Sequence, residues 1–235
     1  MTRPDPQLRR EVPRVLLLAD GAAVPEGRTV AAVVAVALGA GVDGVVVRER
    51  HLRPADRENL GRQVRVAAQV ARSHAALLWA APMPGDASVA PAQPQDDALG
   101  PTAGVHLRAD DPFPGCRPPG LVGRSCHTAD QLRRAADEGC DYVTLSPVGR
   151  SRSKPGYGPA LGPGGMRELL EHAAYLTPQS PRVLALGGVE PGSARQWLGA
   201  GAHGVAVMAA VMGADDPAAA AAELVAEVMG SVPTP

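Results

Sequence analysis

The chain has 235 residues, a formal net charge of −1 and 3 cysteines. The length suits one domain of α/β-barrel size. The near-neutral charge, without a long basic run, argues against nucleic acid or a membrane surface as a partner. The odd number of cysteines and the lack of a CxxC pair argue against a disulfide framework or a zinc site. Because the first residues form no apolar signal region, we expect a cytoplasmic protein.

Short runs rich in Val and Leu alternate along the chain with runs rich in Ala, Arg and Glu. The first type predicts buried strands, and the second predicts amphipathic helices. Strands are predicted at 14–20, 44–50, 75–80, 103–107, 121–125, 141–146, 182–188 and 203–209, and helices at 28–41, 55–72, 128–139, 164–174, 191–200 and 217–229.

This alternation predicts an α/β fold, a (β/α)8 TIM barrel in a single domain. The barrel would cover residues 14–229, between an N-terminal extension, 1–13, and a C-terminal tail, 230–235. The alternative is an open doubly wound sheet, although no GxGxxG motif follows the first strand to support dinucleotide binding. A long loop at 147–165 follows the sixth predicted strand, where TIM-barrel enzymes carry chemistry.

A phosphate site is predicted after the seventh and eighth strands, where TIM barrels commonly bind phosphate. Gly187 and Gly188 end the seventh strand and allow backbone N–H groups to approach an anion. The small residues that follow the eighth strand, beginning at Met208 and Ala209, leave further amides accessible. The alternative interpretation of the paired glycines is a plain tight turn.

The loop after the sixth strand contains Lys154, the only lysine in the chain. Lysine is a compact charge that can enter a narrow phosphate pocket, whereas the guanidinium of arginine is a wide planar fork. Ser151 and Ser153 add hydroxyl donors at alternate positions. The three residues predict a phosphate-binding loop, and the alternative is a solvated loop that retains a lysine by chance.

Two more groups stand at predicted strand ends. Arg48 and Arg50 share one face of the second strand and are candidates to line an anionic pocket or to form a salt bridge. Ser125 and His127 share a face at the end of the fifth strand. His127 is a candidate acid/base because histidine titrates near neutral pH, and the alternative is a structural histidine. Cys126 points to the opposite face, which argues against a Cys–His nucleophile.

A pair of carboxylates, Asp110 and Asp111, follows the fourth strand. Paired carboxylates can hold Mg²⁺ through their oxygens, and the alternative is a solvated acidic turn.

Several motifs occur in order: "GVDGVVVRER", "GVHLRADD", "VGRSCHTADQLRRAADEGC", "TLSPVGRSRSKPG" and "VLALGGVEPGSARQWLGAGAHGVAVMAAVMGADDP". Together they resemble the thiamine-phosphate synthase superfamily, which also contains the TenI-like thiazole tautomerases. The resemblance implies a (β/α)8 barrel that handles a thiazole phosphate. It also implies that Ser151, Ser153, Lys154, Gly187 and Gly188 bind that phosphate.

The chain departs from the synthase pattern in several places. Synthases carry Gln-x-Arg-x-Lys on the second strand, where this chain has Val46, Arg48 and Arg50. Of the expected Mg²⁺ pair only Asp111 is clearly retained, and Ala209 replaces a serine after the eighth strand. In a synthase, the missing Asn-Asp turn after the third strand would have to be supplied by Asp86, Asp96 or Asp97.

The leading hypothesis is therefore a thiazole tautomerase that aromatises a carboxythiazole phosphate with His127 as acid/base and needs no cofactor. One alternative is a thiamine-phosphate synthase that joins hydroxymethylpyrimidine diphosphate and thiazole phosphate with Mg²⁺. The other is a non-catalytic regulator that binds thiazole phosphate. We expect a small phosphorylated thiazole as substrate, no nucleic acid or membrane partner, and a homo-oligomer built through apolar helix surfaces.

Overall fold

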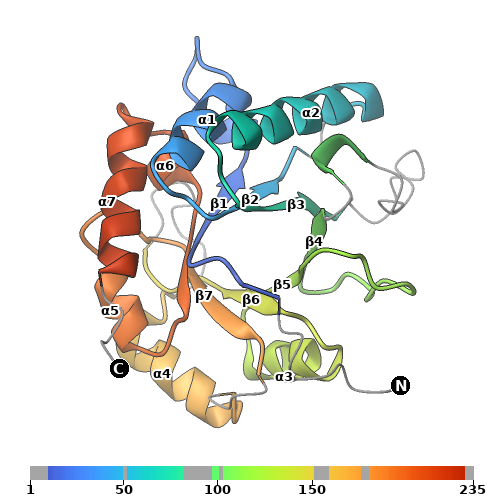
Figure 1. Cartoon of the computed structure of the whole chain (residues 1–235). Helices are drawn as coiled ribbons and strands as arrows, with labels where there is room; N and C mark the ends of the chain where they lie inside the picture. The colour runs from blue at the N-terminus through green and yellow to red at the C-terminus, as the bar shows by residue number, and fades with distance from the viewer. Residues whose placement is uncertain are drawn as a thin grey trace.

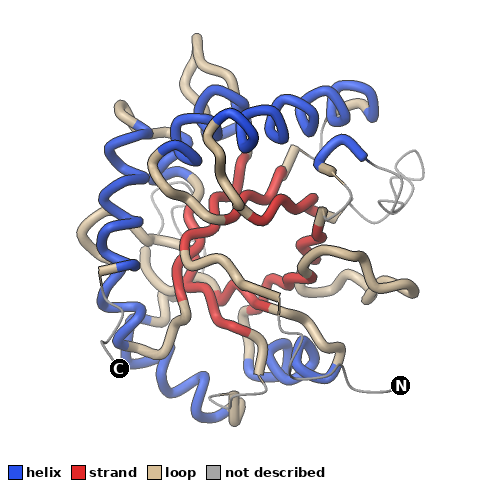
Figure 2. Tube along the Cα trace, viewed as in Figure 1, coloured by secondary structure: helices blue, strands red, loops and turns tan. Residues whose placement is uncertain are grey.

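The computed structural model describes residues 10–49, 52–81, 97–100, 103–150, 159–175 and 180–230. In it, parallel strands close into a barrel in chain order, and the last strand pairs with the first. Figure 2 shows the strands as a ring seen end-on, with the helices outside it. The closure confirms the predicted TIM barrel and rules out the open sheet. The proposed division into extension, barrel and tail stays a prediction.

The barrel consists of strands β1 to β8, each joined to its neighbour (Figure 1). Their bounds are Val15–Ala19 (β1), Gly44–Val47 (β2), Ala76–Ala80 (β3), Gly104–Leu107 (β4), Val122–Cys126 (β5), Tyr142–Leu145 (β6), Arg182–Leu186 (β7) and Gly204–Val207 (β8). The α-helices are Val30–Gly39 (α1), Pro54–Val70 (α2), Ala129–Asp137 (α3), Gly162–His172 (α4), Ala194–Gly199 (α5), Ala209–Met212 (α6) and Pro217–Met229 (α7). Two 3-10 turns occur at Gly21–Ala23 (η2) and Asp97–Leu99 (η3).

Several element boundaries differ from the sequence prediction, among them the ends of β2 and β7, which lie at Val47 and Leu186 rather than at residues 50 and 188. The predicted eighth strand continues to residue 209, but β8 ends at Val207 and α6 begins at Ala209. The fifth helix is predicted from residue 191, but α5 begins at Ala194, after a turn in which Ser193 N–H donates to the carbonyl of Glu190. These errors arise because a short apolar or polar run does not by itself reveal where a strand ends or where a helix begins.

Strand alternation divides the apolar side chains into two layers. One set, including Leu16, Leu18, Val46 and Leu184, fills the inside of the barrel. The intervening residues, such as Leu17, pack outward against the helices in a larger cluster. The core therefore rests on Val, Leu and Ala, as is usual for a parallel sheet covered by helices. Residues 108–120 form no helix, as their proline content predicts.

Side-chain caps fix several helix starts. Thr29 Oγ1 accepts from Ala32 N–H at α1, and Asp216 Oδ1 accepts from Ala219 N–H at α7. At α3, Thr128 Oγ1 accepts from Gln131 N–H at 3.3 Å. These caps satisfy amides that the first helical turn leaves unpaired.

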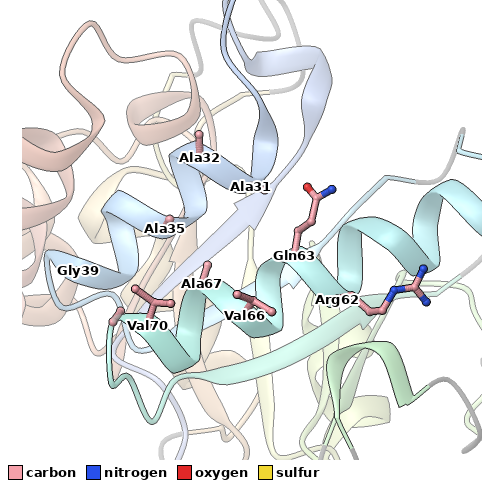
Figure 3. Close-up of a pocket in the computed structure, with 10 residues that line it drawn as sticks. Ala31, Ala32, Ala35, Gly39, Arg62, Gln63, Val66, Ala67 and Val70 are labelled. Carbon is pink, nitrogen blue, oxygen red and sulfur yellow. The ribbon is translucent and has the colours of Figure 1, made fainter.

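An open groove of about 680 Å³ lies between α1 and α2 (Figure 3). Its lining is mostly small and apolar, with Arg62 and Gln63 among the few polar contributors. None of the candidate site residues that the structure describes lines it. The groove therefore belongs to the helix layer and is separate from the candidate site described below. Among the described helices, none has the length and apolar content that crossing a membrane requires.

Candidate functional site

The described candidate residues gather at one end of the barrel. Arg48 directly follows β2, His127 directly follows β5, Gly187 directly follows β7, and Met208 directly follows β8. Because all strands are parallel, these carboxyl ends form one mouth, which is the face where TIM barrels hold their active sites. Arg50, Ser151, Ser153 and Lys154 lie outside the described residues.

Arg48 joins three strand ends. Its Nη1 forms an ion pair with Oδ2 of Asp20, which follows β1. The same nitrogen lies 3.9 Å from Sδ of Met208, which follows β8. Asp20 also caps η2 by accepting from Ala22 N–H at 3.1 Å. The guanidinium is thus oriented by a carboxylate and retains donors for an anion, since arginine carries five N–H groups. Both interpretations of Arg48, salt bridge and anion contact, are compatible with this geometry.

The imidazole of His127 is held in one tautomer. Its Nδ1 lies 2.7 Å from the carbonyl oxygen of Ser146 and 3.3 Å from the Ser146 hydroxyl. A carbonyl only accepts hydrogen bonds, so Nδ1 carries the proton and the neutral ring keeps its lone pair on Nε2. The backbone N–H of His127 donates to Oε1 of Gln131. In this tautomer, Nε2 is the ring atom of His127 that can accept a proton.

Cys126 does not take part in this arrangement. Its side chain is fully buried in the layer between barrel and helices, and Sγ donates to the carbonyl of Gln131. Burial raises the pKa of the Cys126 thiol to about 12. A thiolate is the reactive form, so the geometry agrees with the argument against a Cys–His nucleophile.

The glycine pair after β7 lies against the loop that follows β6. Gly187 and Gly188 have φ of 88° and 68°, values that favour glycine. A Cβ on Gly188 would lie 2.5 Å from the backbone carbon of Gly149. Val148 N–H donates to the carbonyl of Leu186 at 3.0 Å, and Gly149 N–H donates to that of Gly187 at 2.8 Å. The two mouth loops are therefore in direct backbone contact.

The far side of the β6 loop is anchored at the same place. Leu161 N–H donates to the carbonyl of Pro147, and Gly162 N–H donates to that of Val148, at 3.1 and 2.9 Å. The chain on both sides of residues 151–158 is thus tied to the short segment that contacts Gly187 and Gly188. This fixes where the predicted phosphate-binding loop leaves and rejoins the barrel.

Met208 and Ala209 are placed differently from the prediction. They form the N-cap and first residue of α6 rather than the end of a strand. Within the described chain, no side chain caps this helix start. The small residues after β8 therefore present a helical turn beside the mouth, a common element of TIM-barrel phosphate sites.

Asp111 is engaged by its own neighbour. Its carboxylate accepts from Arg108 N–H at 2.8 Å and forms an ion pair with the Arg108 guanidinium at 3.0 Å. Fully buried Arg124 donates to the carbonyls of Arg108, Ala109 and Asp111, which fixes this turn. Within the described ranges, no group of three or more His, Cys, Asp or Glu side chains is arranged to hold a metal ion. Asp111 is thus the one described carboxylate of the predicted pair that this turn holds in place, and its role as a Mg²⁺ ligand stays a prediction.

Sequence reasoning missed a polar chain inside the barrel. His106 of β4 lies 3.0 Å from the hydroxyl of Tyr142 and 3.0 Å from the hydroxyl of Ser125. The sequence indicates an interior position for His106, with packing or a single hydrogen bond, but both ring nitrogens are used. Alternation places the three side chains inward, whereas their pairing depends on strand register, which the sequence does not reveal.

Comparison with known proteins identifies the family. A family model described as thiamine monophosphate synthase matches residues 15–211. The chain belongs to this family. Among curated members, a thiamine-phosphate synthase of Methanoculleus marisnigri is 41% identical over 126 residues. A thiamine biosynthesis bifunctional protein ThiM/ThiE of Symbiobacterium thermophilum is 42% identical over 130 residues.

The thiamine monophosphate synthase family model covers more of this chain than the alignments with the two single relatives do. The alignments cover 52% and 53% of this chain, and 57% and 26% of the two relatives. A solved thiamine phosphate pyrophosphorylase from Pyrococcus furiosus superposes with a TM-score of 0.71 over 92% of this chain and 96% of that one. Its sequence identity of 22% makes this a likeness of fold.

Proposed function

We propose that the chain is a thiamine-biosynthesis enzyme that binds a phosphorylated thiazole at the barrel mouth, and that its activity is that of a thiamine-phosphate synthase. The family match over residues 15–211 carries this proposal, and the named relatives support it. The comparisons thus favour the reaction that the sequence analysis holds as an alternative to the tautomerase.

The phosphate would bind where the glycine pair, the start of α6 and the loop after β6 meet. Gly187 and Gly188 would supply backbone amides, as would Met208 and Ala209. Lys154, Ser151 and Ser153 would add a charge and hydroxyl donors from the adjoining loop. The contact between the loops at Gly149 and Gly188 supports this placement.

Mg²⁺ belongs to this synthase proposal, because it would neutralise the departing diphosphate. Asp111 would hold the ion, and both of its oxygens also accept hydrogen bonds from Arg108. We assign no step to the ion. A synthase needs further oxygen ligands. Of the aspartates that could replace the missing turn after the third strand, Asp86 and Asp96 lie outside the described residues.

A thiazole tautomerase is the second candidate, favoured by one observation. His127 has its Nδ1 proton directed to the Ser146 carbonyl, which leaves Nε2 as a base at the mouth. Such a group can take a proton from the thiazole ring and return it elsewhere, while the anchored phosphate fixes the ring. Arg48 and Arg50 would hold the substrate carboxylate. The departures at Val46, Arg50 and Ala209 support this reading.

The decisive experiment is an assay of both reactions with the purified protein, with Mg²⁺ and with chelator. Release of diphosphate only with Mg²⁺ identifies the synthase. Proton exchange and aromatisation of carboxythiazole phosphate that resist chelator identify the tautomerase. Binding of thiazole phosphate without either turnover contradicts both and supports the regulator.

The remaining expectations stay proposals. We propose a cytoplasmic homo-oligomer whose subunits meet through apolar helix surfaces, and exposed valines on α1 and α2 support this. We also propose that nucleic acid and membranes are not partners. Mass measurement of the purified chain in solution tests the oligomer, and a monomer contradicts it.

A further inference from the structure

We propose that His106 and Tyr142 are positioning residues that turn the hydroxyl of Ser125 into a hydrogen-bond donor to the bound ligand. The identity of that ligand rests on the proposed function, whereas the direction of the hydrogen bonds rests on the structure alone. The three residues come from β4, β5 and β6, which lie side by side in the barrel (Figure 1).

The contacts form a chain from the barrel interior towards its mouth. The Tyr142 hydroxyl lies 3.0 Å from Nδ1 of His106, and Nε2 of His106 lies 3.0 Å from Oγ of Ser125. The rings of His106 and Tyr142 stack with centroids 5.6 Å apart. Tyr142 is fully buried and His106 nearly so, while Ser125 is half-buried. Ser125 therefore stands between a buried pair and accessible space.

Gly123 makes this chain sterically feasible. In the strand register it pairs with His106 on one side and with Tyr142 on the other. A Cβ at Gly123 would lie 2.5 Å from the Tyr142 hydroxyl oxygen and closer still to its ring. The absence of a side chain thus lets Tyr142 extend across β5 to reach His106 on β4.

The direction of the hydrogen bonds follows from burial. The hydroxyl of Tyr142 has a proton to donate, and its partner is Nδ1 of His106. Were Nδ1 the donor instead, the buried phenolic proton would be left without an acceptor, which is costly. Burial also raises the pKa of Tyr142 well above its ordinary value, which keeps the phenol protonated. Nδ1 therefore accepts.

The tautomer of His106 then sets the role of Ser125. With Nδ1 accepting, the neutral ring carries its proton on Nε2 and donates it to Oγ of Ser125. The serine hydrogen is not used in this contact and remains available for a ligand. Ser125 lies two residues before His127 in the chain, so strand alternation directs both side chains to the same face. Ser125 thus presents a donor close to the base.

The first test reads the tautomer directly. Histidine-labelled wild-type protein is examined by long-range nitrogen–proton NMR, with the His106 signals assigned by their absence in His106→Gln. We expect the proton on Nε2. A proton on Nδ1 overturns the proposal whether or not the protein turns over any thiazole, so this result is independent of the proposed function.

The second test reads the consequence for the ligand. Tyr142→Phe removes the donor to Nδ1. The His106 ring can then carry its proton on Nδ1 and accept the Ser125 hydroxyl hydrogen at Nε2. We expect affinity for thiazole phosphate to fall about tenfold, the scale of one hydrogen bond. In a Ser125→Ala background the same change should have no further effect. An equal loss in both backgrounds overturns the proposal.

A matched control is Tyr175→Phe. Tyr175 is also a buried tyrosine, but its hydroxyl has no hydrogen-bond partner among the described residues. The control loses a phenolic oxygen from the core without touching the polar chain, so its affinity should equal that of wild type. A tenfold loss in this control as well would reduce the effect to general core damage and overturn the proposal.

Discussion

At the scale of single residues, the imidazole of His127 separates the two candidate reactions. In a tautomerase it moves the proton itself, through Nε2, because Nδ1 is committed to the Ser146 carbonyl. In a synthase the departing diphosphate does most of the work. The same side chain therefore has a different weight in each reaction.

Replacement of His127 by Ala is expected to slow a tautomerase reaction by roughly 10²–10⁴-fold, the usual effect of removing a positioned acid/base. Affinity for thiazole phosphate should barely change, because the phosphate elements lie on other loops. Single-turnover kinetics and equilibrium binding measure the two quantities separately. Near-normal tautomerisation with bound substrate would show that His127 is not the acid/base. A milder loss of the synthase reaction, which joins the pyrimidine and the thiazole phosphate, fits the synthase.

For single residues, the sequence predicts which face of a strand a side chain lies on, but not which residues it contacts on neighbouring strands. Alternation predicts that Ser125 and His127 share a face and that Cys126 does not, and the buried thiol agrees. It does not predict that Tyr142 reaches His106 across a glycine, because this depends on the register of three strands. The ion pair of Arg48 with Asp20 was likewise open, since it depends on the register of β1 against β2.

At the scale of elements, the loop after β7 and the loop after β6 act as one unit. Their backbones are joined by two hydrogen bonds, and Gly188 leaves no room for a side chain against Gly149. The sequence predicts both loops and their neighbouring strands, but not this contact. It also extends β8 too far, because an apolar run such as 203–209 suits a strand and a helix equally.

Replacement of Gly188 by Ala should destabilise this unit. A left-handed φ of 68° costs a residue with a Cβ about 1–2 kcal/mol, and the clash with Gly149 adds to this. Urea unfolding should show the loss, and affinity for a phosphorylated ligand should fall with it. The control Gly164→Ala lies inside α4 with open space around it. There the gain should be about 0.5–1 kcal/mol. A Gly188→Ala protein as stable as wild type would contradict the close contact.

At the scale of the whole molecule, the two ends of the barrel have different tasks. The mouth gathers the candidate site, whereas polar groups at the other end hold the strand starts. Asp43 accepts from the N–H groups of Arg14 and Val15 at 2.8 and 2.7 Å, and Asp141 accepts from that of Val122 at 2.7 Å. The alternation of strand and helix patterns predicts the closed barrel, whereas these contacts depend on the register of its strands.

His203 makes the stability of the barrel end where the strands start depend on pH. Its Nε2 lies 3.2 Å from the carbonyl of Val12. Burial lowers the pKa of His203 below its ordinary value of 6.5, and Arg14 and Arg182 act in the same direction, while Val12 and Asp43 oppose them. The unfolded chain therefore binds a proton at a higher pH than the folded one. The stability that neutral His203 contributes is complete above about pH 6.5 and is lost as the pH falls towards the folded pKa.

Replacement of His203 by Gln should remove this part of the pH dependence, because glutamine keeps a donor for Val12 but does not titrate. Between about pH 7.5 and pH 5.5, the free energy of unfolding of wild type should fall more steeply than that of His203→Gln. Urea unfolding at several pH values measures both slopes, and Asp43 is common to the two proteins. The exposed His74, two residues before β3, gives the control His74→Gln, which loses a histidine without removing a buried one. Equal slopes for wild type and His203→Gln would show that burial of His203 does not make the free energy of unfolding depend on pH.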